Sequence, residues 1–475
     1  MRAFSLAEWA CALVPAAMLG ALLLRSIWDV DIFWQLRLGE LILDARRPIM
    51  REPFAATHVN EPLAAIAWLG QAVFAAVRQA SGWTGLRIFD ALCWCGGFWL
   101  IAAACKRRGA TAGSVALAMA LGFIAALPAA SIRPQSFAVL FFGGLLALLK
   151  LELRLWQTVA LAVPLLVLWQ NFHPSVSIAA VALGAHAAGG WAAWLHNRSN
   201  ARPWTATILA PLAALATFAT PDGIGLLAVS ARNAQMSMAV GASEWLPLWI
   251  PDNHVNAVPV AVVALLALRS LIRRPSSILW ADAATMLVLL ILTVTAYRFV
   301  LFWAVATVPV IAASKQNSHP PTTGLMPIAG AALIAVAILT PVLRPTRFSD
   351  NLPMLAVARL KTTDTTGTIF TEPEFAGVLM DAGYPRWRVS YDGRYYRYTD
   401  AEWSRYGEIL AGTYRLRQIE RRYRPAAFVL RPSHTTALCS ELDRPGSGWR
   451  RIWRDEGAAV WVPANPRGKP GSERR

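Results

Sequence analysis

Charged residues are scarce in this chain. Of its 475 residues only 15% are Asp, Glu, Lys or Arg, whereas 56% are hydrophobic and the mean hydropathy is +0.42. Apolar stretches long enough to cross about 30 Å of hydrocarbon recur along most of the sequence. This composition excludes an ordinary water-soluble globular protein and predicts a polytopic membrane protein.

Several kinds of site are also missing from the sequence. No glycine-rich phosphate loop follows a predicted strand and there is no Walker motif, which argues against nucleotide binding. The five cysteines show no metal-ligand spacing, so the sequence indicates neither a disulfide framework nor a zinc site. The net charge of +17 is spread over short loops and the terminal region, so attraction to anionic lipid headgroups explains it more simply than nucleic-acid binding.

The apolar runs predict about eleven membrane-spanning helices. They lie at residues 7–27, 84–105, 113–130, 135–149, 157–171, 175–195, 205–220, 255–268, 278–296, 300–313 and 324–343. Met1 and Arg2 precede the first run as in a signal peptide, but no convincing small-residue cleavage site follows. We therefore interpret this run as a retained signal anchor.

The distribution of charge decides the topology. Residues 61–78 are apolar enough to cross a membrane, but the segment begins with Glu61 and Pro62 and contains Gln71. If it lies along the surface, the basic loops between later spans all fall on one side, as the positive-inside rule requires. We therefore predict a transmembrane domain over residues 1–343, with a cytoplasmic N-terminus and an external loop at residues 28–83 that contains interfacial helices.

After residue 343 the chain becomes charged and aromatic. Short β-rich runs alternate there with segments of helical periodicity, which predicts an α/β domain over residues 344–464. The β-rich runs are at 367–370, 388–392, 426–430 and 460–462, and the helical segments are at 354–360, 374–381 and 400–411. With a cytoplasmic N-terminus, an odd number of spans places this domain on the external side of the membrane. Residues 465–475 are predicted to be a disordered tail.

Two carboxylates, Asp29 and Asp31, stand among aromatic residues where the first apolar run should leave the bilayer. Carboxylates at this depth are costly and usually functional. One held at the lipid boundary can act as a general base toward a membrane-bound substrate. The alternative is that Asp29 or Asp31 only caps the helix that begins near Ile32.

With this topology, further polar residues at the ends of spans fall on the same side as Asp31. They are Arg133, Gln135, Asn171, His173, Asp222, Glu244, Tyr297 and Arg298. Such a set suits group transfer from a lipid phosphate. The charge on the leaving phosphate would be stabilised by Arg133, His173 or Arg298, or by a divalent cation (Mg²⁺ or Mn²⁺) held by carboxylates.

Each of these residues also has a structural interpretation. His173 precedes Pro174 and is equally consistent with a hydrogen-bonded interfacial histidine. The arginines are long enough to reach lipid headgroups. Asp222 is typical of a turn, and Glu244 with its neighbouring tryptophan is typical of an aromatic belt.

The same residues resemble the motifs of the bacterial GT-C glycosyltransferase-like membrane proteins. The matching positions are Asp31, Trp34, Leu36, Gly39, Pro53, Phe54, Trp68, the step Arg133, Pro134 and Gln135, the step Trp169, Asn171 and His173, the turn Pro221 and Gly223, the pair Glu244 and Trp245, and the turn Asp392, Gly393 and Arg394. The chain departs from the pattern at Gln35, where the family has a histidine. This departure removes a potential metal ligand and leaves metal dependence undecided.

The resemblance implies a GT-C-like helical fold in the bacterial inner membrane, with the α/β domain in the periplasm. It implies a polyprenyl-phosphate-linked sugar as the donor and a lipid, polysaccharide or protein as the acceptor. In the wider superfamily an acidic residue of the first external loop acts in transfer, and this role falls on Asp31, with Asp29 as the second candidate. Further site candidates are Gln35, Gln135, Asn171, Glu244, Asp392 and Arg394.

Two other functions stay open. A non-catalytic assembly factor for cell-surface polysaccharide could keep the same fold, and Gln35 favours this reading. A transporter of lipid-linked sugars is the third hypothesis, although transporters usually bury charged sites near the membrane midplane. In the outer domain, Tyr396 and Tyr398 are expected either to contact the acceptor through their hydroxyls or to pack the domain.

Overall fold

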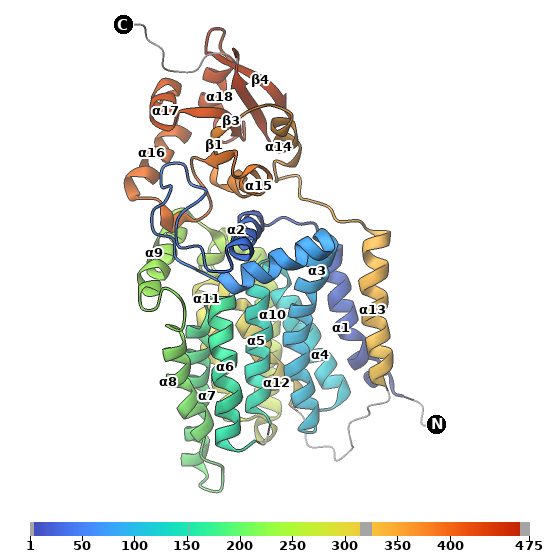
Figure 1. Cartoon of the computed structure of the whole chain (residues 1–475). Coiled ribbons are helices and arrows are strands. Elements are labelled where there is room, and N and C mark those ends of the chain that lie inside the picture. Colours follow the sequence, from blue (N-terminus) through green and yellow to red (C-terminus); the bar gives the residue numbers. More distant parts are fainter. Residues whose placement is uncertain (1–3, 152, 314–324, 466–475) are drawn as a thin grey trace. The chain divides into compact units, whose positions relative to one another are not determined.

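The computed structural model describes residues 4–151, 153–313 and 325–465 (Figure 1). The chain forms two compact units. The helical unit comprises Met1–Ser26 and Ala65–Arg347, and the sheet unit comprises Ile27–Ala64 and Phe348–Arg475. Most of the tail predicted to be disordered, residues 466–475, lies outside the described residues.

The helical unit is a bundle of apolar helices. Its α-helices are α1 (Leu6–Leu24), α3 (Trp68–Arg107), α4 (Ala112–Ala126), α5 (Gln135–Leu149), α6 (Leu155–Phe172), α7 (Val176–His196), α8 (Trp204–Ala216), α9 (Gly225–Ala239), α10 (His254–Arg273), α11 (Trp280–Thr295), α12 (Val300–Ala312) and α13 (Met326–Leu343). Seven stretches of described chain are long and apolar enough to cross a membrane, and four shorter apolar helices accompany them. Each of the eleven predicted spans coincides with one of these helices, which confirms the prediction of a helical polytopic protein.

The ambiguous segment before residue 84 is the first part of α3. This helix runs for 40 residues but is interrupted at Gly82, whose φ of 64° and ψ of −165° are open to glycine and strained for other residues. Figure 1 shows the first part of α3 lying across the end of the bundle before the second part enters it. This geometry is consistent with an interfacial helix followed by a span.

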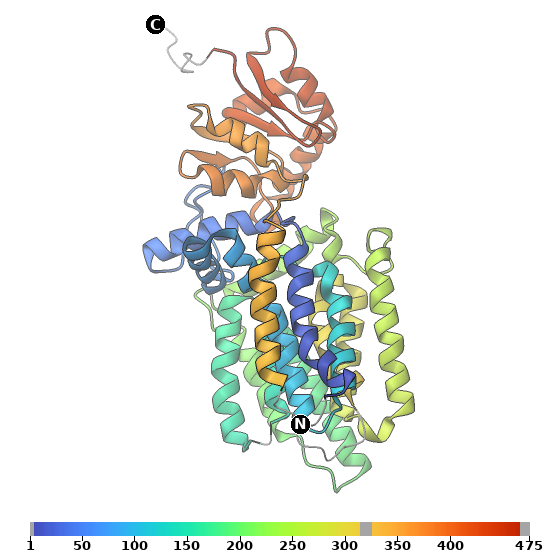
Figure 2. The same ribbon diagram turned by 90° about the vertical axis from the view of Figure 1, so that its right-hand side faces the viewer.

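Close contacts between backbones hold the bundle together. A Cβ atom on Gly143 of α5 would lie 2.0 Å from the carbonyl oxygen of Gly97 of α3, so these helices meet without intervening side chains. At the edge of the bundle, α13 runs along α1 in both views (Figures 1 and 2). Small residues therefore allow α3 and α5 to pack closely within the bundle.

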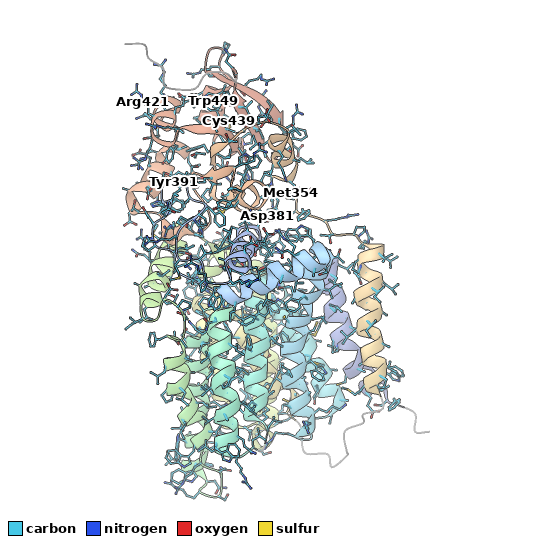
Figure 3. All side chains as sticks on the ribbon, viewed as in Figure 1. Met354, Asp381, Tyr391, Arg421, Cys439 and Trp449 are labelled. Carbon is cyan, nitrogen blue, oxygen red and sulfur yellow. The ribbon has the colours of Figure 1, made fainter. Side chains whose placement is uncertain are left out.

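The sheet unit is an α/β domain, as predicted. Its elements are α2 (Asp31–Ala45), α14 (Met354–Lys361), β1 (Gly367–Thr371), α15 (Pro373–Gly383), β2 (Trp387–Val389), α16 (Asp400–Leu410), α17 (Leu416–Tyr423), β3 (Pro425–Leu430), α18 (Thr436–Leu442), β4 (Trp449–Arg454) and β5 (Ala459–Pro463). The strand order is β2-β1-β3-β5-β4, with β1 parallel to β2 and β3 and with β5 antiparallel to β3 and β4. The labelled Tyr391 in Figure 3 belongs to its buried core and shares a hydrogen bond of 2.6 Å with Tyr423.

Three elements of this unit were not predicted: β4, α17 and α18. The edge strand β4 has arginines among its tryptophan and isoleucine residues, and α17 carries only three buried residues among its charges, so neither shows a strong apolar run. Their stability comes from contacts with the rest of the domain, such as the hydrogen bond of 2.6 Å from the Trp449 indole to Glu420.

Residues 27–64 are built into the α/β domain. Ala55 pairs with Val389 at the end of β2, and Ile27 pairs with Phe348. A Cβ atom on Gly377 of α15 would lie 2.3 Å from the carbonyl oxygen of Val30, so the chain just before α2 packs directly against α15. The sequence assigned this stretch to a loop of the transmembrane domain; the structure places it in the sheet unit, where it carries Asp29 and Asp31.

Candidate functional site

The predicted site residues form two clusters, one in each unit. In the sheet unit, the backbone N–H of Asp31 donates to Asp29 Oδ1 at 2.8 Å, and the Trp34 indole N–H donates to Asp31 Oδ1 at 3.0 Å. The N-cap residue of α2 is Val30, so neither aspartate occupies the capping position itself. Asp29 is only 1% exposed, whereas Asp31 is partly exposed at the first turn of the helix. Asp29 therefore positions the backbone, and Asp31 is the more accessible carboxylate.

A tight turn lies against the Asp31 carboxylate. A Cβ atom on Gly393 would be 2.9 Å from Asp31 Oδ1. The turn is fixed by Arg394, which donates to both oxygens of Glu52 at 2.7 and 2.9 Å and to both oxygens of Asp392 at 3.0 and 2.7 Å. All three side chains of this charged triad are 0–1% exposed. The contacts of Arg394 thus serve the fold of the turn.

The pKa shifts of Asp392 and Arg394 agree with a structural role for this triad. Burial raises the pKa of Asp392, but the charge of Arg394 outweighs it and holds the pKa below the ordinary value. The pKa of Arg394 lies well above its ordinary value because the two carboxylates offset its burial. Tyr398 is buried and donates its hydroxyl to Asp392 Oδ2 at 3.1 Å, which supports the packing interpretation of this tyrosine.

Gln35 lies one turn into α2. Its Oε1 is buried and has no hydrogen-bond partner among the described residues. Within the same described chain, no group of three or more His, Cys, Asp or Glu side chains is arranged to hold a metal ion. Mg²⁺ or Mn²⁺ dependence stays an open prediction.

The second cluster lies on short connections between helices of the helical unit. Arg133 precedes α5 and is 3.2 Å from a Glu244 carboxylate oxygen. Arg298 stacks over the Trp245 ring, with its guanidinium carbon 3.5 Å from the ring centre. Cation–π stacking and ion pairing together hold both guanidiniums in place.

His173 joins this cluster from the turn between α6 and α7. Its Nδ1 is 2.8 Å from Ser175 Oγ, and Ser175 Oγ also accepts a hydrogen bond of 2.9 Å from the Trp169 indole. Asn171 fixes the turn by donating to the carbonyl oxygens of residues 167 and 219 and by accepting from the Trp68 indole at 2.8 Å. Asn171 is therefore a structural residue of the site.

The arginines act on both titratable groups of the cluster. Burial, together with the charges of Arg298 and Arg133, lowers the pKa of His173 to about 3. Burial raises the pKa of Glu244, but the same two arginines outweigh it and hold the pKa below the ordinary value. At neutral pH the cluster therefore holds two guanidinium cations, one carboxylate and a neutral imidazole.

Other candidates hold the loops around the cluster. The Gln135 amide donates to Ala129 O at 2.9 Å and to Ser131 Oγ at 3.0 Å. Asp222 accepts from the backbone of Ala65 at 2.8 Å, which agrees with its interpretation as a turn residue. Sequence analysis missed Arg25, which donates to the carbonyl oxygens of Leu127 and Ala130 at 2.5 and 2.6 Å. Its position directly after the first apolar run could have identified it as a candidate.

Comparison with solved structures gives the fold. The crystal structure of ArnT from Cupriavidus metallidurans in the apo state superposes with a TM-score of 0.57 at 11% identity, and the match covers 96% of this chain and 97% of that chain. The chain has a GT-C-like fold. The crystal structure of ArnT bound to undecaprenyl phosphate matches with a TM-score of 0.54 at 12% identity over the same shares. No protein-family model matches the sequence, and no curated protein does.

The GT-C-like fold confirms the resemblance found in the motifs. Because the match spans nearly all of both chains, it includes the helical bundle and the α/β domain. At 11–12% identity the likeness establishes the fold alone, so the roles of individual residues rest on their own geometry.

Proposed function

We propose that this protein is a membrane glycosyltransferase that moves a sugar from a polyprenyl-phosphate donor to an acceptor on the outer face of the bacterial inner membrane. The observation that carries the proposal is the cluster of Arg133, Glu244, Arg298 and His173 on connections between apolar helices of a GT-C-like fold. ArnT, which shares that fold, has been crystallised with undecaprenyl phosphate.

The charges of the cluster suit a lipid-linked phosphodiester. Two guanidiniums and one carboxylate give a net charge of one positive unit, which matches the single negative charge of a sugar phosphodiester. Arginine binds phosphate oxygens through paired hydrogen bonds, and these strengthen where water is excluded. As the sugar departs, the phosphate gains negative charge and these contacts become stronger.

Asp31 is proposed as the general base. The acceptor hydroxyl oxygen attacks C1 of the sugar while its proton passes to a carboxylate oxygen of Asp31. The bond between C1 and the phosphate oxygen breaks, and its electron pair stays on the phosphate. Asp29, which is buried and binds the Asp31 backbone, is the positioning residue in this scheme.

Binding of undecaprenyl phosphate tests the phosphate site. We expect Arg298→Gln and Arg133→Gln each to weaken binding by roughly 10- to 100-fold, because each removes a charged hydrogen-bond donor. The measurement is isothermal titration of the full chain in phosphatidylcholine nanodiscs. Arg273→Gln, an exposed arginine at the last turn of α10, is the control and should bind as wild type. Equal affinity in all variants would remove the cluster from the phosphate site.

Reporter fusions test the orientation. We expect fusions after Arg108 and Arg198 to report a cytoplasmic position and a fusion after Arg475 to report a periplasmic one, because the basic loops follow the positive-inside rule. Alkaline phosphatase and green fluorescent protein give opposite signals on the two sides. A periplasmic signal at Arg108 would contradict the topology.

The assembly-factor hypothesis is favoured by one observation. Gln35 replaces the histidine of the family pattern, and its Oε1 is buried without a hydrogen-bond partner among the described residues. A protein of this kind would bind polyprenyl phosphate but transfer no sugar. Transfer assays with the same nanodisc preparation separate the two functions.

A further inference from the structure

The turn between α6 and α7 determines which nitrogen of His173 carries the proton. Three side chains meet there: Trp169 and Ser175 are buried, and His173 is partly exposed. Ser175 Oγ lies between the other two, 2.9 Å from Trp169 Nε1 and 2.8 Å from His173 Nδ1. Trp169 itself packs against the rings of Phe142 and Phe302, which also contact each other.

The direction of these hydrogen bonds follows from donor and acceptor chemistry. An indole N–H only donates, so Ser175 Oγ accepts from Trp169. The serine hydroxyl hydrogen then needs an acceptor, and within the described residues the only acceptor found for it is His173 Nδ1. The reverse arrangement would leave a buried hydroxyl hydrogen unsatisfied, which is costly. Nδ1 is therefore the acceptor, and the proton of the neutral ring is on Nε2.

The surrounding charges keep the ring neutral. Burial disfavours an imidazolium most, and the charges of Arg298, in the short turn before α12, and of Arg133, before α5, add to its effect. Glu244, the carboxylate of the cluster, is already paired with Arg133. With a pKa of about 3, His173 does not change charge between pH 5 and 8.

We propose that His173 binds the donor phosphate as a neutral Nε2–H donor, with Ser175 and Trp169 as positioning residues that fix its tautomer. This inference rests on the proposed function. In this step the leaving phosphate receives no proton. The electron pair of the broken C1–O bond stays on the phosphate, which is bound by two guanidiniums and by the N–H group of His173. The acceptor proton goes to the general base, so the step is balanced without an acid.

Nuclear magnetic resonance of the full chain tests the tautomer directly. The chain has seven histidines, so ¹⁵N-histidine labelling in nanodiscs gives few signals, and the one lost in His173→Gln is His173. We expect a protonated Nε2 and an unprotonated Nδ1 that do not change from pH 5 to 8, and a mixture of tautomers in Ser175→Ala. Protonation of Nδ1, or an imidazolium signal above pH 5, would overturn the proposal.

Titration with undecaprenyl phosphate tests whether the Nε2–H group of His173 binds the phosphate. Gln places an amide N–H near the position of Nε2, so His173→Gln should bind within about threefold of wild type, whereas His173→Leu should bind roughly tenfold or more weakly. His196→Gln, at the exposed end of α7, is the matched control. Equal affinity of the Gln and Leu variants would overturn the role of His173. If wild type shows the expected tautomer but binds no lipid, the proposed function fails while the tautomer assignment stands.

Discussion

Asp31→Asn is expected to reduce sugar transfer by roughly 100-fold or more, because an amide cannot accept a proton at neutral pH. The substitution keeps the shape of the side chain, and its Oδ1 can still accept the hydrogen bond from the Trp34 indole. The protein should therefore fold and insert normally. Transfer is measured from a panel of polyprenyl-phosphate sugars in nanodiscs, together with complementation of a null strain.

Two comparisons make this result specific. Asp29→Asn should reduce transfer less than Asp31→Asn, since Asp29 is buried and acts through the Asp31 backbone. Thermal unfolding of both variants checks that the fold is intact. Full complementation by Asp31→Asn would argue against a catalytic carboxylate and for the assembly-factor hypothesis.

Arg394→Met is expected to destabilise the sheet unit by about 3–5 kcal/mol, the usual cost of removing one partner from a buried ion pair. The variant would leave Asp392 buried without its cation, while Glu52 would keep only Arg397, whose Nε lies 3.4 Å from Glu52 Oε2. Because the pKa of Asp392 is held below its ordinary value, this stabilisation is present at neutral pH and is lost as the pH falls through the folded-state pKa. Denaturant unfolding of the full chain in nanodiscs measures the effect.

A pair with the same closest N–O distance but an exposed arginine provides the control. Arg415 lies 2.7 Å from Glu441, as Arg394 lies 2.7 Å from Glu52, but the Arg415 side chain is 63% exposed. Arg415→Met should cost less than about 1 kcal/mol. Adding Glu52→Gln to Arg394→Met should restore part of the stability by neutralising one of the two carboxylates that lost Arg394. Equal losses in the two single variants would mean that burial does not determine the strength of these pairs.

Much of the candidate site was visible in the sequence, but the roles of its members were not. Arg133, Glu244, Arg298 and His173 were chosen because they stand at the ends of spans on the predicted external side, and the structure brings them together. The side chains of Gln135 and Asn171 instead hold turns. Arg394 was a site candidate, yet one of its two carboxylate partners, Glu52, lies 342 positions away and was not predicted to take part.

The sheet unit was likewise predicted only in part. The strands β1, β2, β3 and β5 were predicted because their short runs are rich in β-branched and aromatic residues. The edge strand β4 was missed because arginines interrupt its tryptophan and isoleucine residues. The pairing of Ala55 with Val389 joins residues 27–64 to the domain, and it cannot be predicted from the local sequence of either segment.

The sequence by itself determined the membrane-spanning helices, the α/β character of the last quarter and the GT-C resemblance. Hydropathy and periodicity depend only on neighbouring residues, so they can be read without the fold. Only the tertiary structure decided which carboxylates share the Arg394 guanidinium and which side chains lie beside the imidazole of His173. The energy of a buried charge or hydrogen bond depends on all the atoms around it, and folding brings those atoms from distant parts of the chain.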